Sequence, residues 1–210
     1  MATHELIPLF PLSLVLLPAM PLPLHIFEER YKEMIGDLLS TQGEFGVVLA
    51  KDNGIVNIGC TARVERVVKR YPDGRLDLVA IGQRRFIIDS LDEEKSYLRA
   101  QVEFFNDEDA TEVPFDLRQR TRQAYRTLLA LEEPGAVAEP NFDLNRMSFQ
   151  VAQFISDVDK RQTVLSLRSE IARLEFLVNV IPEYVAQQER IARANRVAPL
   201  NGHVKAQIGQ

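Results

Sequence analysis

Apolar residues dominate the first 31 positions of the chain, and prolines interrupt them at 8, 11, 18, 21 and 23. Proline fixes φ and has no backbone N–H, so neither a helix nor a central strand continues through this spacing. The pattern therefore predicts short extended segments packed against a core, with buried strands at 6–10 and 14–17. The same prolines weigh against a signal peptide and against a membrane span, in which backbone groups would lack partners.

A helix is predicted directly afterwards, over residues 28–39, because the apolar positions change to a spacing of three and four. Glu28 and Glu29 at its start suit the positive end of the helix dipole. One face of this predicted helix is apolar, and it carries Phe27, Tyr31, Met34, Ile35 and Leu38.

Strand patterns alternate with short turns from residue 45 to residue 104. Tyr71–Arg75 has the composition of a hairpin turn, and Gly82-Gln83 predicts a second tight connection. The alternation of faces slips near Arg66-Val67, which indicates a β-bulge. The expected strands cover 45–50, 58–71, 76–80, 85–88 and 97–104. About six or seven short strands with one helix favour a small closed or half-closed barrel over a parallel sheet.

Helical spacing returns in the second part of the chain, over 116–131, around 147–158 and from 167 onward. Asp159 and Gln162 are spaced like a capping box, so we expect a short helix to begin there. Pro182 lies inside the last and longest helix, where we expect a kink or a break.

The acidic stretch at 106–114, which ends in a proline, separates these two patterns and is interpreted as a linker. We therefore predict a β-barrel subdomain over residues 1–113 and a helical bundle over 114–196. Residues 197–210 contain a proline and an Asn-Gly pair, and we expect them to form a disordered tail.

The composition is that of an ordinary soluble globular protein, with 46% hydrophobic and 26% charged residues among 210. The net charge is −5; residues 1–113 carry −7 and the remainder +2, so the chain as a whole does not favour nucleic acid as a partner. A single cysteine, Cys60, excludes an internal disulfide and fits a reducing compartment, so we expect a cytoplasmic protein without membrane contact.

Side chains for catalysis or metal binding are sparse. His4, His25, His203 and Cys60 are not spaced as metal ligands. A free cysteine at a strand start is more often buried than reactive. The chain has neither a glycine-rich phosphate loop nor a Gly-x-Ser-x-Gly elbow. We therefore expect a non-enzymatic protein that uses no cofactor and no metal.

Two stretches are candidates for binding. The first is apolar and includes a turn that has few ways to pair its backbone; its candidate peptide-binding residues are Met20, Pro21, Leu22, Leu24, Phe27 and Tyr31. Exposed apolar residues often mark a partner site, although the same residues also suit a plain core. The second is a basic hairpin with Arg63, Arg66, Lys69, Arg70 and Arg75. It is either a solvated sheet face balanced by carboxylates or an RNA-binding surface, with Tyr71 as a stacking ring.

Several segments together resemble the Lon protease N-terminal, substrate-binding domain family: Leu9–Leu12, Leu16–Tyr31, Gly46–Leu49, Ile58–Val64 and Gly82–Phe86. The resemblance implies an α+β fold, with a PUA-like β pseudo-barrel followed by an α-helical bundle. It also implies binding of unfolded or exposed polypeptide segments, as an adaptor or chaperone-like factor in protein quality control, with a separate protease as a further candidate partner. Because the chain ends at Gln210, we expect the ATPase and peptidase of Lon proteases to be absent.

Overall fold

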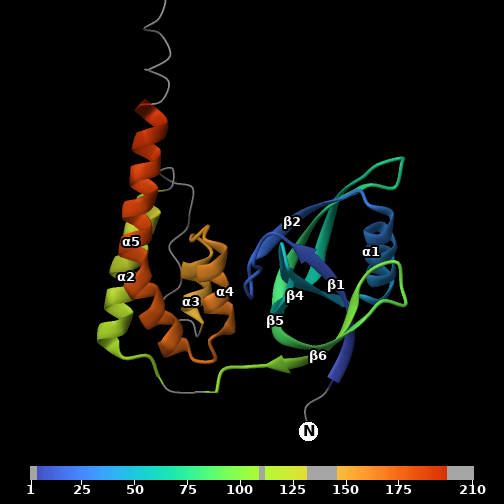
Figure 1. Ribbon diagram of the computed structural model, residues 1–210, viewed down its shortest axis with the longest axis horizontal. Coiled ribbons are helices and arrows are strands. Elements are labelled where there is room, and N and C mark those ends of the chain that lie inside the picture. Colours follow the sequence, from blue (N-terminus) through green and yellow to red (C-terminus); the bar gives the residue numbers. More distant parts are fainter. Residues whose placement is uncertain (1–3, 109–111, 132–145, 198–210) are drawn as a thin grey trace, which may run out of the picture.

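The strands come first along the chain and most of the helices come last, as the hydrophobic pattern predicts. A computed structural model of the protein describes residues 4–108, 112–131 and 146–197, with side chains as far as 194. The strands and one helix form a barrel, and the later helices form a second part beside it (Figure 1). The strands are β1 (His4–Leu12), β2 (Pro21–Ile26), β3 (Glu44–Lys51), β4 (Gly54–Arg70), β5 (Leu76–Asp92) and β6 (Arg99–Phe105).

The long strand β5 closes the sheet into a barrel. The strand order is β2-β5-β4-β3-β1-β6, and β5 also pairs with β6. One edge of β5 pairs with β4; the other edge pairs with β2 along residues 76–81 and with β6 along residues 85–92. β1 and β3 are parallel, whereas the other pairs are antiparallel. All described edges of the ring are therefore paired, and β2 lies as an extra strand on β5.

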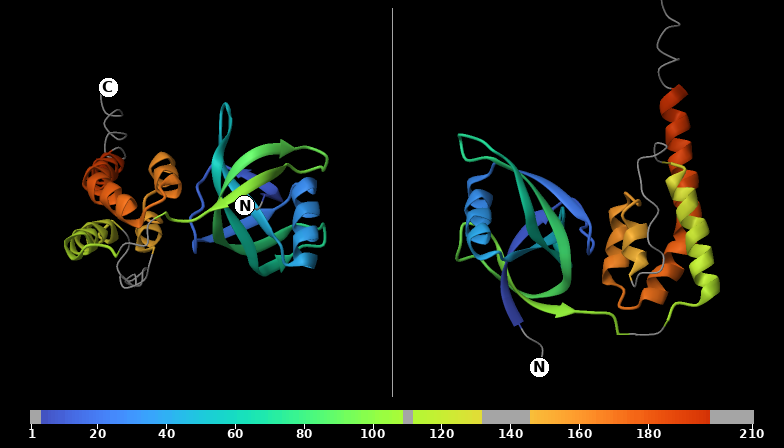
Figure 2. Two further views of the ribbon diagram at one scale, coloured as in Figure 1. Left: turned by 90° about the horizontal axis from the view of Figure 1, so that it is seen from below. Right: turned by 180° about the vertical axis from the view of Figure 1, so that it is seen from behind.

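Helix α1 (Glu29–Thr41) packs against the barrel on the side away from the later helices (Figure 2). Four predicted apolar residues, Tyr31, Met34, Ile35 and Leu38, are buried. Phe27 is not, because it precedes the helix and its side chain is 60% exposed. The prediction that Phe27 shares this face was wrong: the chain is still extended at Glu28, the N-cap, so helical spacing does not apply to Phe27.

Two predicted features of the strands are also corrected. Residues 14–17 are not a strand; they belong to a loop that buries Val15, Leu16 and Leu17 in the core. Gly82-Gln83 is not a turn, because β5 runs through it without interruption. Both corrections have one cause, which is that the backbone of this loop lies directly against β5. Ala19 N donates to Gly82 O at 2.8 Å, and Gly82 N donates to Met20 O at 3.0 Å. The glycine permits the loop to cross close to β5.

The four later helices form two layers. α2 (Phe115–Leu129) and α5 (Glu170–Val197) lie side by side, and α3 (Met147–Ala152) and α4 (Val158–Ser166) lie between that pair and the barrel (Figure 1). The N-cap of α4 is Asp157 rather than Asp159, because its carboxylate accepts from two backbone N–H groups at 3.0 Å. α5 is not broken at Pro182, whose neighbour Ile181 is fully buried.

One apolar core continues from the barrel into the helices. The same cluster of contacting buried residues contains Phe45 and Cys60 of the barrel, Val164 and Leu165 of α4, and Ile181 of α5. Gln162 of α4 also donates to Ile58 O of β4 at 3.1 Å. The two parts thus share buried surface, and the division into subdomains at residue 113 stays a prediction.

A buried polar cluster lies where β5, the segment after β6, α3 and α5 meet. It consists of Arg85, Asp107, Ser148, Glu170 and Arg173, and we call it the interface cluster. The Arg173 guanidinium is fully buried and bonds to both carboxylate oxygens of Asp107 at 2.6 and 2.7 Å. It also bonds to Glu170 at 2.7 Å and to Ser148 Oγ at 2.8 Å. Every charge in this cluster therefore has a direct partner.

Arg85 connects the barrel to the same cluster. Its guanidinium donates to Asp107, to Leu167 O at 2.6 Å and to Leu165 O at 3.2 Å. Burial by itself raises the pKa of the Asp107 carboxyl, but hydrogen bonds and positive charge from Arg173 and Arg85 outweigh burial and lower that pKa. Asp107 is therefore held in its ionised form between two arginines.

None of the described helices combines the length and the apolar character needed to cross a bilayer.

Candidate functional site

The candidate site is the outer face of β2, β5 and β4. The strand registers place residues of these strands in three rows: Pro21–Ile81–Arg63, Pro23–Val79–Arg66 and His25–Asp77–Lys69. Their neighbours along β2 and β5, such as Leu22, Ala80 and Leu78, are buried, so these nine residues point away from the core. We call this set the outer face.

Two bulges in β4 bring its three cations onto this face. Arg63, Arg66 and Lys69 are three residues apart, and in a regular strand such residues alternate between the two faces. The pairing of β4 with β5 shifts between Val64 and Arg66 and again between Val67 and Lys69, which leaves Glu65 and Val68 as extra residues. The predicted irregularity near Arg66-Val67 is confirmed, and Val68 is 61% exposed.

The floor of the outer face is apolar. Pro21 and Pro23 are exposed, and Val79 and Ile81 are half-buried between them and the cations of β4. Half-buried Met20 adjoins the same strand. An apolar floor beside a row of cations suits a ligand that has both apolar and acidic groups.

Aromatic side chains gather at one end of this face. The His25 ring is stacked on Phe27, with 5.9 Å between ring centroids, and meets Tyr71 edge-on at 5.9 Å. Asp77 holds the group together by accepting from Tyr71 Oη at 2.8 Å and bonding to His25 Nδ1 at 2.5 Å. We call His25, Phe27 and Tyr71 the aromatic corner. Its exposed apolar member is Phe27.

Hydrogen bonds from His25 and Tyr71 to Asp77 lower the pKa of that carboxyl, with a further contribution from the positive charge of Lys69. Asp77 is therefore ionised at neutral pH and is already engaged by neighbours. The cations of Lys69 and Arg75 lie over the Tyr71 ring, at 4.4 and 4.9 Å from its centroid.

The cations of the hairpin differ in how they are paired. Arg63 forms an ion pair with Glu44 at 2.8 Å, and Arg75 forms one with Asp73 at 2.7 Å. Among the described residues, no carboxylate forms an ion pair with Arg66, Lys69 or Arg70. Arg66 is therefore a cation in the middle row of the outer face with no carboxylate at ion-pair distance among the described residues, whereas the charge of Lys69 also acts on Asp77.

The structure separates the predicted peptide-binding residues into two groups. Leu22 and Tyr31 are 3% and 7% exposed, so the prediction that they are accessible to a peptide was wrong. Leu22 alternates inward along β2, and Tyr31 lies on the buried face of α1. Leu24 points inward as well and is half-buried. Of the remaining members, Pro21 belongs to the outer face and Phe27 to the aromatic corner, whereas Met20 is half-buried and packs against the core.

The basic residues are also divided. Arg63, Arg66 and Lys69 lie on the outer face, whereas Arg70 pairs with the inward-facing Leu76 and so points to the opposite side. Arg75 lies over Tyr71 at the hairpin end. Sequence reasoning did not identify Pro23, His25, Val79 and Ile81 as surface residues of one site. Only the registers of three strands place them together.

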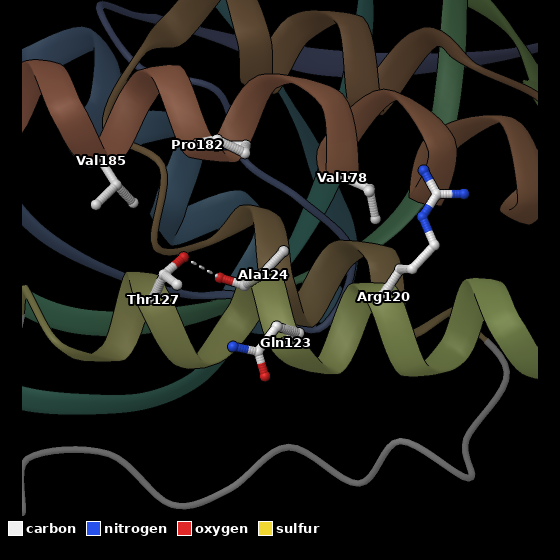
Figure 3. Close-up of a pocket in the computed structure, with 7 residues that line it drawn as sticks. All are labelled: Arg120, Gln123, Ala124, Thr127, Val178, Pro182 and Val185. Atoms are coloured by element: carbon white, nitrogen blue, oxygen red, sulfur yellow. Dashed lines mark hydrogen bonds between the residues drawn. The ribbon is translucent and has the colours of Figure 1, made fainter.

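A groove lies between α2 and α5, away from the outer face, as Figure 3 shows. It has a volume of about 430 Å³ and is lined mainly by apolar groups of Ala124, Val178, Pro182 and Val185. Thr127 is also part of the lining, but its hydroxyl donates to Ala124 O at 2.7 Å. This groove brings no pair of reactive side chains together.

The comparison with protein families shows which family the chain belongs to. Residues 6–182 match the family described as the ATP-dependent protease La (LON) substrate-binding domain, and this match covers most of the chain. The chain belongs to this family.

Two Lon proteases show how far the relationship extends. The Lon protease of Parabacteroides distasonis is 28% identical over 200 residues, which cover 83% of this chain and 24% of the relative. That of Flavobacterium johnsoniae is 26% identical over 180 residues, which cover 77% of this chain and 22% of the relative. The chain therefore spans about a quarter of the length of these curated Lon proteases.

Solved structures of the Lon family confirm the predicted α+β fold class, a barrel of strands followed by helices. A Lon N-terminal domain protein from Xanthomonas campestris has a TM-score of 0.69 and 25% identity, covering 83% of this chain and 98% of that one. The N-terminal domain of the Mycobacterium avium complex Lon protease has a TM-score of 0.63 and 16% identity, covering 85% and 98%. The second likeness supports the fold alone.

The segments that carry the Lon family resemblance lie mainly around the barrel core. A Cβ added at Gly46 or Gly59 would lie 2.6 or 2.5 Å from the ring of Phe86, so both positions leave room for that ring. Gly82, in turn, leaves room for the loop at Leu17. These positions specify how the barrel packs. They do not specify what the outer face binds.

The single cysteine, Cys60, is not placed to act as a nucleophile. Its thiol is fully buried in β4, and burial raises its pKa to about 12. A thiol with that pKa carries almost no thiolate at neutral pH, and thiolate is the reactive form. Among the described residues, no group of three or more histidine, cysteine or carboxylate side chains is arranged to hold a metal ion.

In the native protein, Cys60 is expected not to react with dithionitrobenzoate, because the buried thiol is neither accessible nor ionised. In denaturant, the same sample should release one equivalent of thionitrobenzoate, since the chain has one cysteine. Absorbance measured before and after denaturation tests this. Rapid reaction of one equivalent in the native state would contradict the burial of Cys60.

Proposed function

We propose that this chain binds exposed or unfolded polypeptide segments, and that it does so through the outer face and the aromatic corner. Membership of the Lon substrate-binding domain family supports a substrate-binding role. The observation that carries the choice of surface is the grouping of Phe27, which is 60% exposed, with exposed Pro21 and Pro23 on one face. Contiguous exposed apolar groups commonly mark a partner site.

The proposed mode of binding is contact between side chains rather than addition of a strand. Gly82 N donates to Met20 O, so the backbone N–H and C=O groups of even-numbered residues in β2 point toward β5. The backbone groups of odd-numbered residues point toward the free edge of β2. That edge has prolines at 21 and 23, which provide no N–H group. A strand added there would lose ladder hydrogen bonds, so a bound segment is expected to lie on the outer face, along the direction of the strands.

We further propose that binding takes place without catalysis by this chain, as an adaptor or chaperone-like step in protein quality control with a separate protease. The burial of Cys60 supports a non-catalytic role, and the Lon relatives support a proteolytic context. We propose the cytoplasm as its compartment, because the chain has one cysteine and that cysteine is buried.

RNA binding is a second candidate, favoured by Arg66, Lys69 and Arg70, none of which forms an ion pair within the part of the chain that the structure describes. The surroundings of Tyr71 weigh against it. Two cations already lie over the ring, and its hydroxyl is bonded to Asp77. A base would have to displace them in order to stack on Tyr71.

The substitution Phe27→Asp is expected to weaken binding of a fluorescein-labelled peptide of Leu, Phe, Ser and Gly by about tenfold, because it removes the exposed apolar anchor. Fluorescence anisotropy measures the dissociation constant. Stability should change little, since the Phe27 side chain is already largely in solvent.

Phe115→Asp is the matched control, because Phe115 is 76% exposed at the start of α2, outside the outer face and the aromatic corner. It makes the same chemical change and should leave peptide affinity unaltered. Equal losses in both variants, or none in Phe27→Asp, would exclude the proposed surface.

A further inference from the structure

We infer that the outer face selects acidic polypeptide segments, with an apolar residue followed by carboxylates at the second and fourth positions after it. This inference rests on the proposed function and names the class of segment that the surface would prefer. Its basis is the row of cations that the two β4 bulges place beside the apolar floor.

The local charge contrasts with that of the surrounding sequence. Residues 1–113 carry a net charge of −7, yet residues 63–77 contain five cations and three carboxylates. Two of those carboxylates are engaged locally: Asp73 by Arg75, and Asp77 by His25 and Tyr71. The third, Glu65, is one of the two extra residues at the bulges and has no row partner on β5. Among the described residues, no carboxylate forms an ion pair with Arg66 or Lys69, so each can pair with a carboxylate of a partner. Lys69 also acts on Asp77 across its row.

The spacing of the rows fits an extended chain. Adjacent rows are two residues apart along β5, about 6.6 Å for a strand. Side chains on one side of an extended segment have the same spacing, because they also occur at every second residue. Carboxylates at alternate positions can therefore reach Arg66 and Lys69 at the same time.

The remaining row gives the segment its direction. Pro21 and Ile81 are apolar, and Arg63 in the same row is already paired with Glu44. An apolar side chain is thus favoured beside the first row and carboxylates beside the second and third. Charge complementarity of this kind adds specificity and accelerates association more than it adds affinity.

The test compares two fluorescein-labelled peptides that differ only in charge. The first repeats Leu-Ser-Glu-Ser-Glu, and the second has Gln in place of each Glu. We expect the Glu peptide to bind about tenfold more tightly at low salt, and the difference to disappear at about 0.5 M salt because the cations are exposed to solvent. Anisotropy titrations at both salt concentrations measure this.

A double charge reversal, Arg66→Glu with Lys69→Glu, should abolish the preference for Glu, which is measured as the ratio of the dissociation constants of the Gln and Glu peptides in the same variant. Arg126→Glu with Arg190→Glu is the matched control: both arginines are exposed on helices, and the net charge changes equally. The control should keep the preference. Loss of the preference in the control would mean that net charge, not the outer face, selects the ligand, and would overturn the inference.

The outcomes separate the two proposals. Equal binding of the Glu and Gln peptides would overturn the acidic preference while the proposed function stands. Failure of both peptides to bind would contradict the proposed function itself. A single-stranded RNA that displaces the Glu peptide and binds more tightly than it does would overturn the inference in favour of nucleic acid.

Discussion

Replacing Arg173 by methionine is expected to lower the free energy of unfolding by about 3–5 kcal/mol, the largest stability effect that we predict. The Arg173 side chain is fully buried, and it bonds to Asp107, Glu170 and Ser148. Methionine would fill part of the space but would leave two carboxylates near one another with much less positive charge. A buried charge that loses its partner is far more costly than an exposed one.

Equilibrium unfolding in urea measures this loss, with Arg168→Met as the matched control. Arg168 precedes α5 and forms an ion pair with Glu108, in the segment after β6, at 3.1 Å. This pair is exposed to solvent, because the side chains of Arg168 and Glu108 are 40% and 71% exposed. Its loss should cost less than about 1 kcal/mol. Similar losses in the two variants would show that burial of the interface cluster contributes little.

The interface cluster also determines how the unfolding should proceed. Arg85 comes from the barrel and Arg173 from α5, and both bond to Asp107 in the segment that joins them. Because the apolar core is continuous across the same boundary, we expect barrel and helices to unfold together in the native protein. Arg173→Met weakens this connection directly.

The second large effect is expected for Gly82→Ala, which should destabilise the protein by about 3 kcal/mol. A Cβ at this position would lie 2.1 Å from the carbonyl oxygen of Leu17, and a backbone atom cannot move aside as a flexible side chain can. The loop before β2 would have to shift, together with its bonds between Ala19, Met20 and Gly82. Peptide affinity should fall as well, because this loop leads directly into β2 of the outer face.

Gly36→Ala provides the control for this substitution. Gly36 is exposed in α1, and an added Cβ would have no neighbour within 4 Å. Alanine has the higher helix propensity, so this variant should gain about 0.5–1 kcal/mol. Thermal unfolding of both variants measures the two effects. Equal stability of Gly82→Ala and the parent protein would contradict the close crossing of the loop over β5.

Local signals in the sequence determined much of this protein. Prolines excluded a helix from residues 8–23, helical spacing identified α1, α2 and α5, and the turn residues at 71–75 identified the β4–β5 hairpin. The irregular alternation near Arg66 indicated a bulge, which the pairing confirms. These predictions succeeded because each depends on residues that are close together in the chain.

Features that depend on distant segments were decided by the tertiary structure. The apolar residues 14–17 suit a buried strand as well as a buried loop, and only the approach of β5 at Gly82 makes them a loop. Gly82-Gln83 looks like a turn for the same reason: a glycine needed for a close crossing has the same local signature as one needed for a turn. Leu22 and Tyr31 were predicted to be accessible, yet strand alternation and helix packing bury them.

The candidate site shows the same division. The sequence by itself determined that apolar, proline-rich residues and a basic hairpin exist, but it treated them as two separate alternatives. The registers of β2, β5 and β4 place Pro23, Val79 and Arg66 in one row, and two bulges turn three cations to one side. Register depends on pairing between segments more than fifty residues apart, as between Pro23 and Val79, and no local pattern encodes it.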